Sequence, residues 1–126
     1  MRGIKILLAF VLVLAFAGQA TAQSTISFDS GYPKTGSGSG EIAVQGSISL
    51  ACGWSLSGTT VTVSAWQEGC MVTCTTLSIN SCTNTFTGSI GGLTSGVPYS
   101  VTVEVAVTKS GIPQTLQNSA NGVNPK

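Results

Sequence analysis

Alternating apolar and polar residues dominate the chain from about residue 41 to residue 109. The clearest run is 99–107, where Tyr99 and the valines at odd positions share one face while Ser, Thr, Glu and Ala occupy the even positions. The same period of two recurs at 41–50, 59–66 and 84–90. Successive side chains of a strand point to opposite faces, so these runs predict half-buried β-strands. Beyond residue 22, no stretch has the apolar spacing of an amphipathic helix.

The segment 70–79 departs from this regularity. Cys70, Val72 and Cys74 are in phase with each other, whereas Leu77 and Ile79 have the opposite parity. We expect a bulge or tight turn near Thr75 to absorb the switch. Turn signals separate the runs at 57–58, 68–69, 80–81, 91–92 and 95–96. Short strands divided by such turns predict an all-β, antiparallel sandwich.

A short segment, 93–103, has the sequence LTSGVPYSVTV. It resembles the E–F corner of fibronectin type III domains, L-x-P-G-x-x-Y-x-V-x-V, with Ser95 in place of the usual proline and an added Pro98. The resemblance implies an immunoglobulin-like Greek-key sandwich in which Leu93 and Tyr99 are core anchors and the tyrosine hydroxyl bonds to backbone. Transthyretin-like or collagen-adhesin B-type repeats are a second resemblance, and they are also Greek-key sandwiches.

The first residues have the pattern of an export signal. Arg2 and Lys5 precede an apolar run at 6–17, and Ala20-Thr21-Ala22 fits signal peptidase, with cleavage before Gln23. We therefore expect a signal peptide at 1–22, no membrane span after its removal, and a secreted, extracellular or periplasmic protein. Gly and Ser alternate within 23–40, which predicts a flexible linker. The sandwich domain is expected at 41–109, followed by a flexible tail at 110–126.

Composition argues against most chemistry. Charged residues are 7% of the chain and histidine is absent. Residues 23–126 contain three lysines and four carboxylates, a net charge of −1, so no basic patch favours nucleic acid. A serine nucleophile lacks a base, and a glycosidase needs two placed carboxylates. Glu41, Glu68 and Glu104 are expected to be solvated surface groups. We predict that the protein is not an enzyme and needs no cofactor or metal.

All four cysteines, Cys52, Cys70, Cys74 and Cys82, follow the predicted signal peptide. An even count in an exported chain predicts two disulfides. Four thiols can also hold zinc, but the spacing lacks paired C-x2-C knuckles. Three pairings are open, and a sandwich layout favours 52–82 with 70–74. Disulfides would stabilise a domain of this size.

The sequence leaves three functional hypotheses. The first is a secreted, non-catalytic β-sandwich module with a structural or adhesive role and an extracellular protein or glycan as partner. The second is a small carbohydrate-binding module that uses Trp66, whose parity is opposite to that of Val61 and Val63. Trp54 shares parity with Ile48 and is expected in the core. The third is a disulfide-stabilised secreted inhibitor that displays the loop 70–82.

Overall fold

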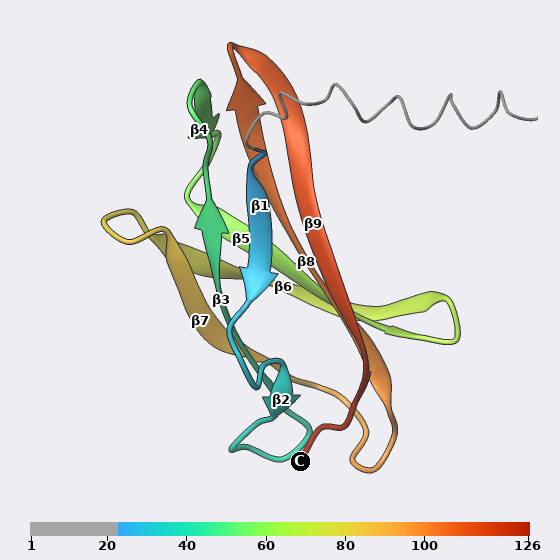
Figure 1. The fold of residues 1–126 in the computed structure, drawn as a ribbon. Coiled ribbons are helices and arrows are strands. Elements are labelled where there is room, and N and C mark those ends of the chain that lie inside the picture. Colours follow the sequence, from blue (N-terminus) through green and yellow to red (C-terminus); the bar gives the residue numbers. More distant parts are fainter. Residues whose placement is uncertain (1–22) are drawn as a thin grey trace, which may run out of the picture.

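The computed structural model describes residues 23–126, so the predicted signal peptide lies outside the described residues. Every regular element in this part of the chain is a β-strand (Figure 1). Among residues 23–126, no helix has the length and hydrophobicity needed to cross a membrane. The strands are β1 (Thr25–Phe28), β2 (Lys34–Thr35), β3 (Ile42–Ser49), β4 (Trp54–Leu56), β5 (Thr60–Gln67), β6 (Cys70–Asn80), β7 (Thr85–Ile90), β8 (Tyr99–Lys109) and β9 (Ile112–Val123).

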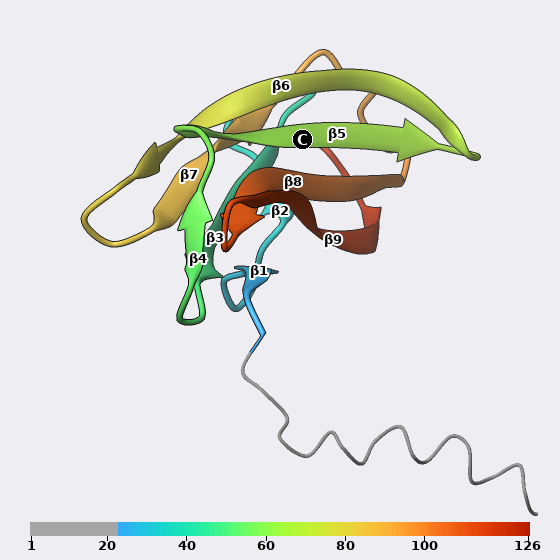
Figure 2. The same ribbon diagram turned by 90° about the horizontal axis from the view of Figure 1, so that it is seen from above.

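The strands form one antiparallel sheet that curls into a nearly closed barrel of seven strands. The order around the wall is β1-β3-β7-β6-β5-β8, with β9 on the other edge of β8. The short β2 extends the position of β1 along β3, and β4 extends that of β5 along β8. Figure 2 shows the strands surrounding a common interior.

The predicted fibronectin-like sandwich is therefore wrong, although the all-β, antiparallel class is confirmed. The difference arises at β6, which pairs with β5 along most of its length and with β7 at Ile79 and Asn80. Through this shared strand the two halves of the wall belong to one sheet rather than to two stacked sheets. The corner motif at 93–103 describes only a local strand–turn–strand arrangement, which both architectures can contain.

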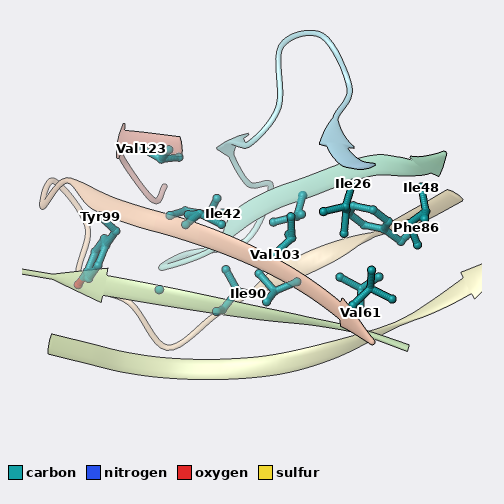
Figure 3. Close-up of a cluster of buried hydrophobic side chains, with 14 of the residues drawn as sticks. Ile26, Ile42, Ile48, Val61, Phe86, Ile90, Tyr99, Val103 and Val123 are labelled. Carbon is teal, nitrogen blue, oxygen red and sulfur yellow. The ribbon is translucent and has the colours of Figure 1, made fainter. Parts of the chain in front are cut away.

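The core lies inside the barrel. The odd-numbered residues of β8 from Tyr99 to Val107 are all buried, which confirms the alternation seen in the sequence. They meet the inward faces of β3, β5 and β7, as the close-up in Figure 3 shows for Ile42, Val61 and Phe86. Burial of apolar side chains in alternate positions thus holds the strands around one interior.

Both ends of the described chain belong to the barrel. The stretches predicted as a flexible linker (23–40) and tail (110–126) contain β1, β2 and the 12-residue β9, so that prediction is wrong. Ile26 is buried, and the Asn118 side-chain amide donates to the Ile26 carbonyl over 3.0 Å. At the other end of the seam, the Gly40 N–H donates to the Lys126 carbonyl over 2.9 Å. These bonds tie β1 and the β2–β3 loop to β9 and the residues that follow it, across the gap of the nearly closed barrel.

A glycine on β3 lets β1 approach closely. Gly46 lies opposite Phe28 on one side and Phe86 on the other. A Cβ atom at Gly46 would overlap the Ser27 carbonyl oxygen and lie 2.7 Å from the Phe86 Cζ atom. The missing side chain therefore provides space for both the β1 backbone and the phenyl ring, which is the reason a strand tolerates glycine here.

Strand β6 contains a β-bulge, but not near Thr75, where the parity switch in the sequence predicted one. Ala65 pairs with Thr73 and Trp66 pairs with Met71, so Val72 is a bulged residue without a partner on β5. Beyond the bulge, Thr73 and Thr75 keep the phase of Leu77 and Ile79, all of them half-buried. The expected bulge near Thr75 is therefore found at Val72. β6 pairs with β7 only at its last two residues, and the two strands then separate.

Candidate functional site

The outer surface of β6, β5, β8 and β9 is a polar sheet face. Residues that alternate with the core line up across the strands in two rows. The first row is Cys74, Ser64, Thr102 and Ser119, and the second is Thr76, Thr62, Glu104 and Gln117. We call these two rows the hydroxyl face. Glu104 is its single charged residue, so the face presents mainly neutral hydrogen-bonding groups.

Hydrogen bonds between side chains order this region. The Thr102 and Ser119 hydroxyls lie 3.2 Å apart, and the Ser100 hydroxyl donates to the Asn121 side-chain oxygen over 2.7 Å. Both contacts join β8 to β9. Such cross-strand pairs each contribute a few tenths of a kcal/mol to about 1 kcal/mol. They also restrict the side-chain rotamers of these residues.

The β5–β6 hairpin projects from the barrel (Figures 1 and 2). Its turn consists of Glu68 and Gly69, with φ of 51° and 83°, the left-handed conformations that suit the twist of a tight hairpin. Met71 and Val72 are 52% and 46% exposed, two of the three large hydrophobic residues exposed in the described part of the chain. We call residues 66–72 the hairpin tip.

Trp66 joins the hairpin tip to the hydroxyl face. It pairs with Met71 on one side and with Ser100 on the other. The side chain is half-buried, and its indole N–H is covered without a hydrogen-bond acceptor. The neighbouring Ser64 is also buried although it belongs to the outer face. Trp66 therefore offers a partly exposed apolar ring rather than an available donor.

Trp54 lies in a different part of the molecule. It is half-buried at the edge of the core, on β4, opposite Lys109. The Lys109 ammonium nitrogen lies 5.5 Å from the centre of the indole ring, within range of a cation–π interaction. The structure thus keeps the two tryptophans apart, and only Trp66 lies beside other exposed apolar side chains.

The four cysteines are exposed and unpaired, so the predicted disulfides are wrong. Cys70 and Cys74 lie on the same strand, where four residues of extended chain separate their backbones by about 13 Å, too far for a disulfide. Cys52 lies between β3 and β4, and Cys82 lies between β6 and β7. The segment 70–82, proposed as an inhibitory loop, is mostly a paired strand.

Thiol chemistry tests this correction directly. We expect a maleimide reagent to label all four cysteines of the natively folded protein, as many as in denaturant, because each is exposed. A reductant should leave the melting temperature unchanged. The measurement is mass spectrometry of the labelled chain beside thermal unfolding followed by circular dichroism. Fewer labelled thiols in the native state, together with a lower melting temperature after reduction, would show that the protein does contain disulfides.

The four carboxylates of residues 23–126 lie in different parts of the barrel and do not form a cluster. Asp29 accepts a hydrogen bond from the Gln45 amide over 2.8 Å, and Glu41 accepts one from the Gly38 N–H over 3.1 Å. Glu68 and Glu104 are exposed on the hairpin turn and the hydroxyl face. Within residues 23–126, no three His, Cys, Asp or Glu side chains gather in a way that could hold a metal ion.

Leu93 and Tyr99 stabilise the fold at the loop between β7 and β8. Both are buried in the core, and the Thr94 N–H donates to the Tyr99 hydroxyl oxygen over 2.9 Å. The bond fixes the loop between β7 and β8. Buried tyrosines usually find such a partner for the hydroxyl while the ring fills the core.

Sequence reasoning selected Trp66 but missed its neighbours. Met71 and Val72 follow the Glu68-Gly69 turn, and apolar residues next to a hairpin turn were the available signal. Ser100 and Thr102 occupy the polar phase of the clearest alternating run, so their outward position could have been read from it. Their alignment with Ser64 and Ser119 depends on strand register, which the alternation does not specify.

Comparison with known proteins adds a fold likeness. No protein-family model matches the sequence. No curated protein matches it either. Among solved structures, the chain is similar to the crystal structure of an engineered protein, a Northeast Structural Genomics Consortium target, with a TM-score of 0.51 and 21% identity. The match covers 83% of this chain but only 20% of that one. At this identity the likeness concerns the fold alone.

Proposed function

We propose that the chain is an exported, non-catalytic binding module with an adhesive or structural role, and that the hairpin tip is the centre of its contact surface. The observation that carries the proposal is the exposure of Met71 and Val72 beside Trp66 on a hairpin that projects from the barrel. Aromatic and methionine side chains are enriched in protein contact surfaces, where they bury large apolar areas.

The surroundings of the hairpin tip support this role. The barrel provides a rigid base, and projecting loops on a rigid scaffold are common binding elements. The adjoining hydroxyl face supplies neutral donors and acceptors that can form the polar rim of a contact. The low charge indicates a partner recognised by shape and apolar contact rather than by electrostatic attraction. Export rests on the leader-like sequence at 1–22.

A neutral carbohydrate is the second candidate partner, and the position of Trp66 favours it. The partly exposed indole lies next to Ser100, whose hydroxyl is bonded to the Asn121 side chain. An apolar ring beside hydroxyl and amide groups suits a sugar, which has an apolar face and a hydroxyl rim. In this case Trp66 would be the main contact, and Met71 and Val72 would lie at its border.

One experiment tests both candidates. The fluorescently labelled chain 23–126 is applied to an array of extracellular proteins and to a glycan array. We expect binding to at least one component, weakened at least tenfold by a Met71→Ser, Val72→Ser double variant because the apolar contact is lost. Ile112→Ser is the matched control, since Ile112 is 61% exposed but is the first residue of β9, away from the β5–β6 hairpin.

The variants separate the outcomes. Binding to glycans that Trp66→Ala removes and Trp66→Phe retains would assign the site to carbohydrate. Binding to a protein that the double variant removes would assign it to an adhesive role. The absence of any binding, or an equal loss in Ile112→Ser, would contradict the proposed surface. Circular dichroism of each variant establishes that it is folded.

A further inference from the structure

We propose that the free edge of β6 is a self-association surface, at which two copies of this chain pair their β6 strands antiparallel. The inference is independent of the proposed function, because it uses the backbone edge of the hairpin rather than its exposed side chains. One edge of β6 is paired with β5 from Cys70 to Ser78. The other edge is paired with β7 only at Ile79 and Asn80.

The segment from Cys70 to Ser78 therefore has no hydrogen-bonded strand on this edge, and only at its end does a side chain, that of Leu77, lie against Gly88 of β7. Within residues 23–126, no other backbone hydrogen bond covers this edge. Figure 2 shows β6 along the outside of the molecule, continuing with β5 into the projecting hairpin. Unpaired N–H and C=O groups along a strand are a template for another strand.

The edges formed by β1, β4 and β9 are better protected. β1 has four residues and lies along β9, where Asn118 bonds to Ile26. β4 has only three residues. β9 contains Pro113, which lacks an N–H donor. Short strands, lysines and prolines are the usual means of preventing edge-to-edge pairing.

The exposed segment of β6 is longer than β1 and β4 and lacks the proline of β9, and its one protective feature is the bulge at Val72. It contains no charged residue and no proline or glycine, and threonine and valine favour extended chain. Because the edge is uncharged, two copies can approach without electrostatic repulsion, and antiparallel pairing of identical strands gives a closed two-fold dimer, so a second copy of the chain fits this edge.

If the two-fold axis of the dimer passes through the middle of the segment, every residue from Cys70 to Ser78 lies opposite a residue of the second copy. Cys74 is the midpoint between Cys70 and Ser78, so pairing around it places Cys74 opposite Cys74 of the second copy. Directly opposite residues in antiparallel strands have Cα atoms about 4.5–5.5 Å apart. This spacing lies within the range that a disulfide requires, which makes Cys74 a reporter of the register.

Sedimentation equilibrium of the chain 23–126 under reducing conditions tests the proposal. We expect a monomer–dimer equilibrium that Cys74→Lys weakens at least tenfold, since it places two like charges opposite each other. Cys52→Lys is the matched control, an exposed cysteine in the β3–β4 loop, and should leave association unchanged. Circular dichroism shows whether each variant is folded, and the cross-linking below does not depend on the lysine variants.

The second measurement uses a variant in which Cys52, Cys70 and Cys82 are serine. Added oxidised glutathione takes up two electrons and two protons from two Cys74 thiols and leaves as two glutathione thiols, joining the copies by a disulfide. A chain that retains only Cys52 should not cross-link under the same conditions. Cross-linking through Cys74 supports the pairing, and a dimer without it would overturn the central register.

Three outcomes would overturn self-pairing itself. The first is a chain that stays monomeric up to millimolar concentration. The second is association that is equally strong in folded Cys74→Lys. The third is protection of the β6 amides from hydrogen exchange only after another protein or peptide is added, which would assign the edge to a different partner.

Discussion

Replacing Phe86 by alanine should be among the most damaging single changes in the barrel. Phe86 is 2% exposed and is the largest fully buried side chain. It lies on β7 opposite Gly46 of β3 and Ile79 of β6, where two halves of the wall join. Phenylalanine-to-alanine changes in cores cost about 3–5 kcal/mol, because contacts are lost and a cavity remains. The free energy of unfolding should fall by this amount.

Denaturant unfolding followed by tryptophan fluorescence and circular dichroism measures the effect. Thr87→Ala is the control, since Thr87 is the next residue of the same strand and is exposed. It should change the free energy of unfolding by less than about 0.5 kcal/mol. Equal stability of the Phe86→Ala and Thr87→Ala variants would show that the ring does not fill the core.

A single methyl group at Gly46 should have an effect of similar size. The Cβ atom of Gly46→Ala would overlap the Ser27 carbonyl oxygen and press on the Phe86 ring. The contact with Ser27 involves backbone, so β1 must move to relieve it. Overpacking of this kind costs about 1–3 kcal/mol. Because β1 must also move, we expect the free energy of unfolding of Gly46→Ala to fall by about 3 kcal/mol.

Gly58→Ala provides the matched comparison. Gly58 lies between β4 and β5, and a Cβ atom there would meet nothing within 4 Å. That variant should be neutral or slightly stabilising, because alanine reduces the entropy of the unfolded chain. Hydrogen exchange gives a second readout, since Gly46→Ala should expose the amides of β1 before those of β8. Equal melting temperatures for Gly46→Ala and Gly58→Ala would contradict the close approach of β1 to Gly46.

The sequence predicted the strands of the core well and their arrangement poorly. Alternation over 99–107 identified the buried face of β8 because a half-buried strand imposes a period of two. Whether strands stack as two sheets or curl into one depends on which edges pair. The double pairing of β6 is a long-range property that leaves no mark on its local pattern.

The strands at the two ends of the described chain escaped prediction for a related reason. β9 contains mostly polar residues such as Gln, Asn, Ser and Thr, and Val123 is its one buried residue. Its ladder with β8 and the bond from Asn118 to Ile26 define it as a strand. Similarly, a glycine-rich stretch was interpreted as a linker although Gly40 is hydrogen-bonded to Lys126. Composition alone cannot show which polar segment finds a partner strand.

The candidate site was predicted in part. The outward position of Trp66 followed from its parity, but the exposed pair Met71 and Val72 depends on the bulge. The cysteines show the opposite error. Their even number suggested disulfides, whereas pairing requires that two sulfur atoms meet in space, and strand β6 holds Cys70 and Cys74 apart.

The seam between β1 and β9 has a consequence for how the protein acquires its fold. Ile26 and Asn118 are 92 residues apart in the sequence, so a ribosome completes β1 long before it makes the strand that closes against it. Until then Ile26 and its neighbours lack part of their cover. Contacts between distant residues slow folding, because the entropy of a long loop is lost before the contact forms. Closure of the seam is therefore expected to be a late event, after β9 has been synthesised.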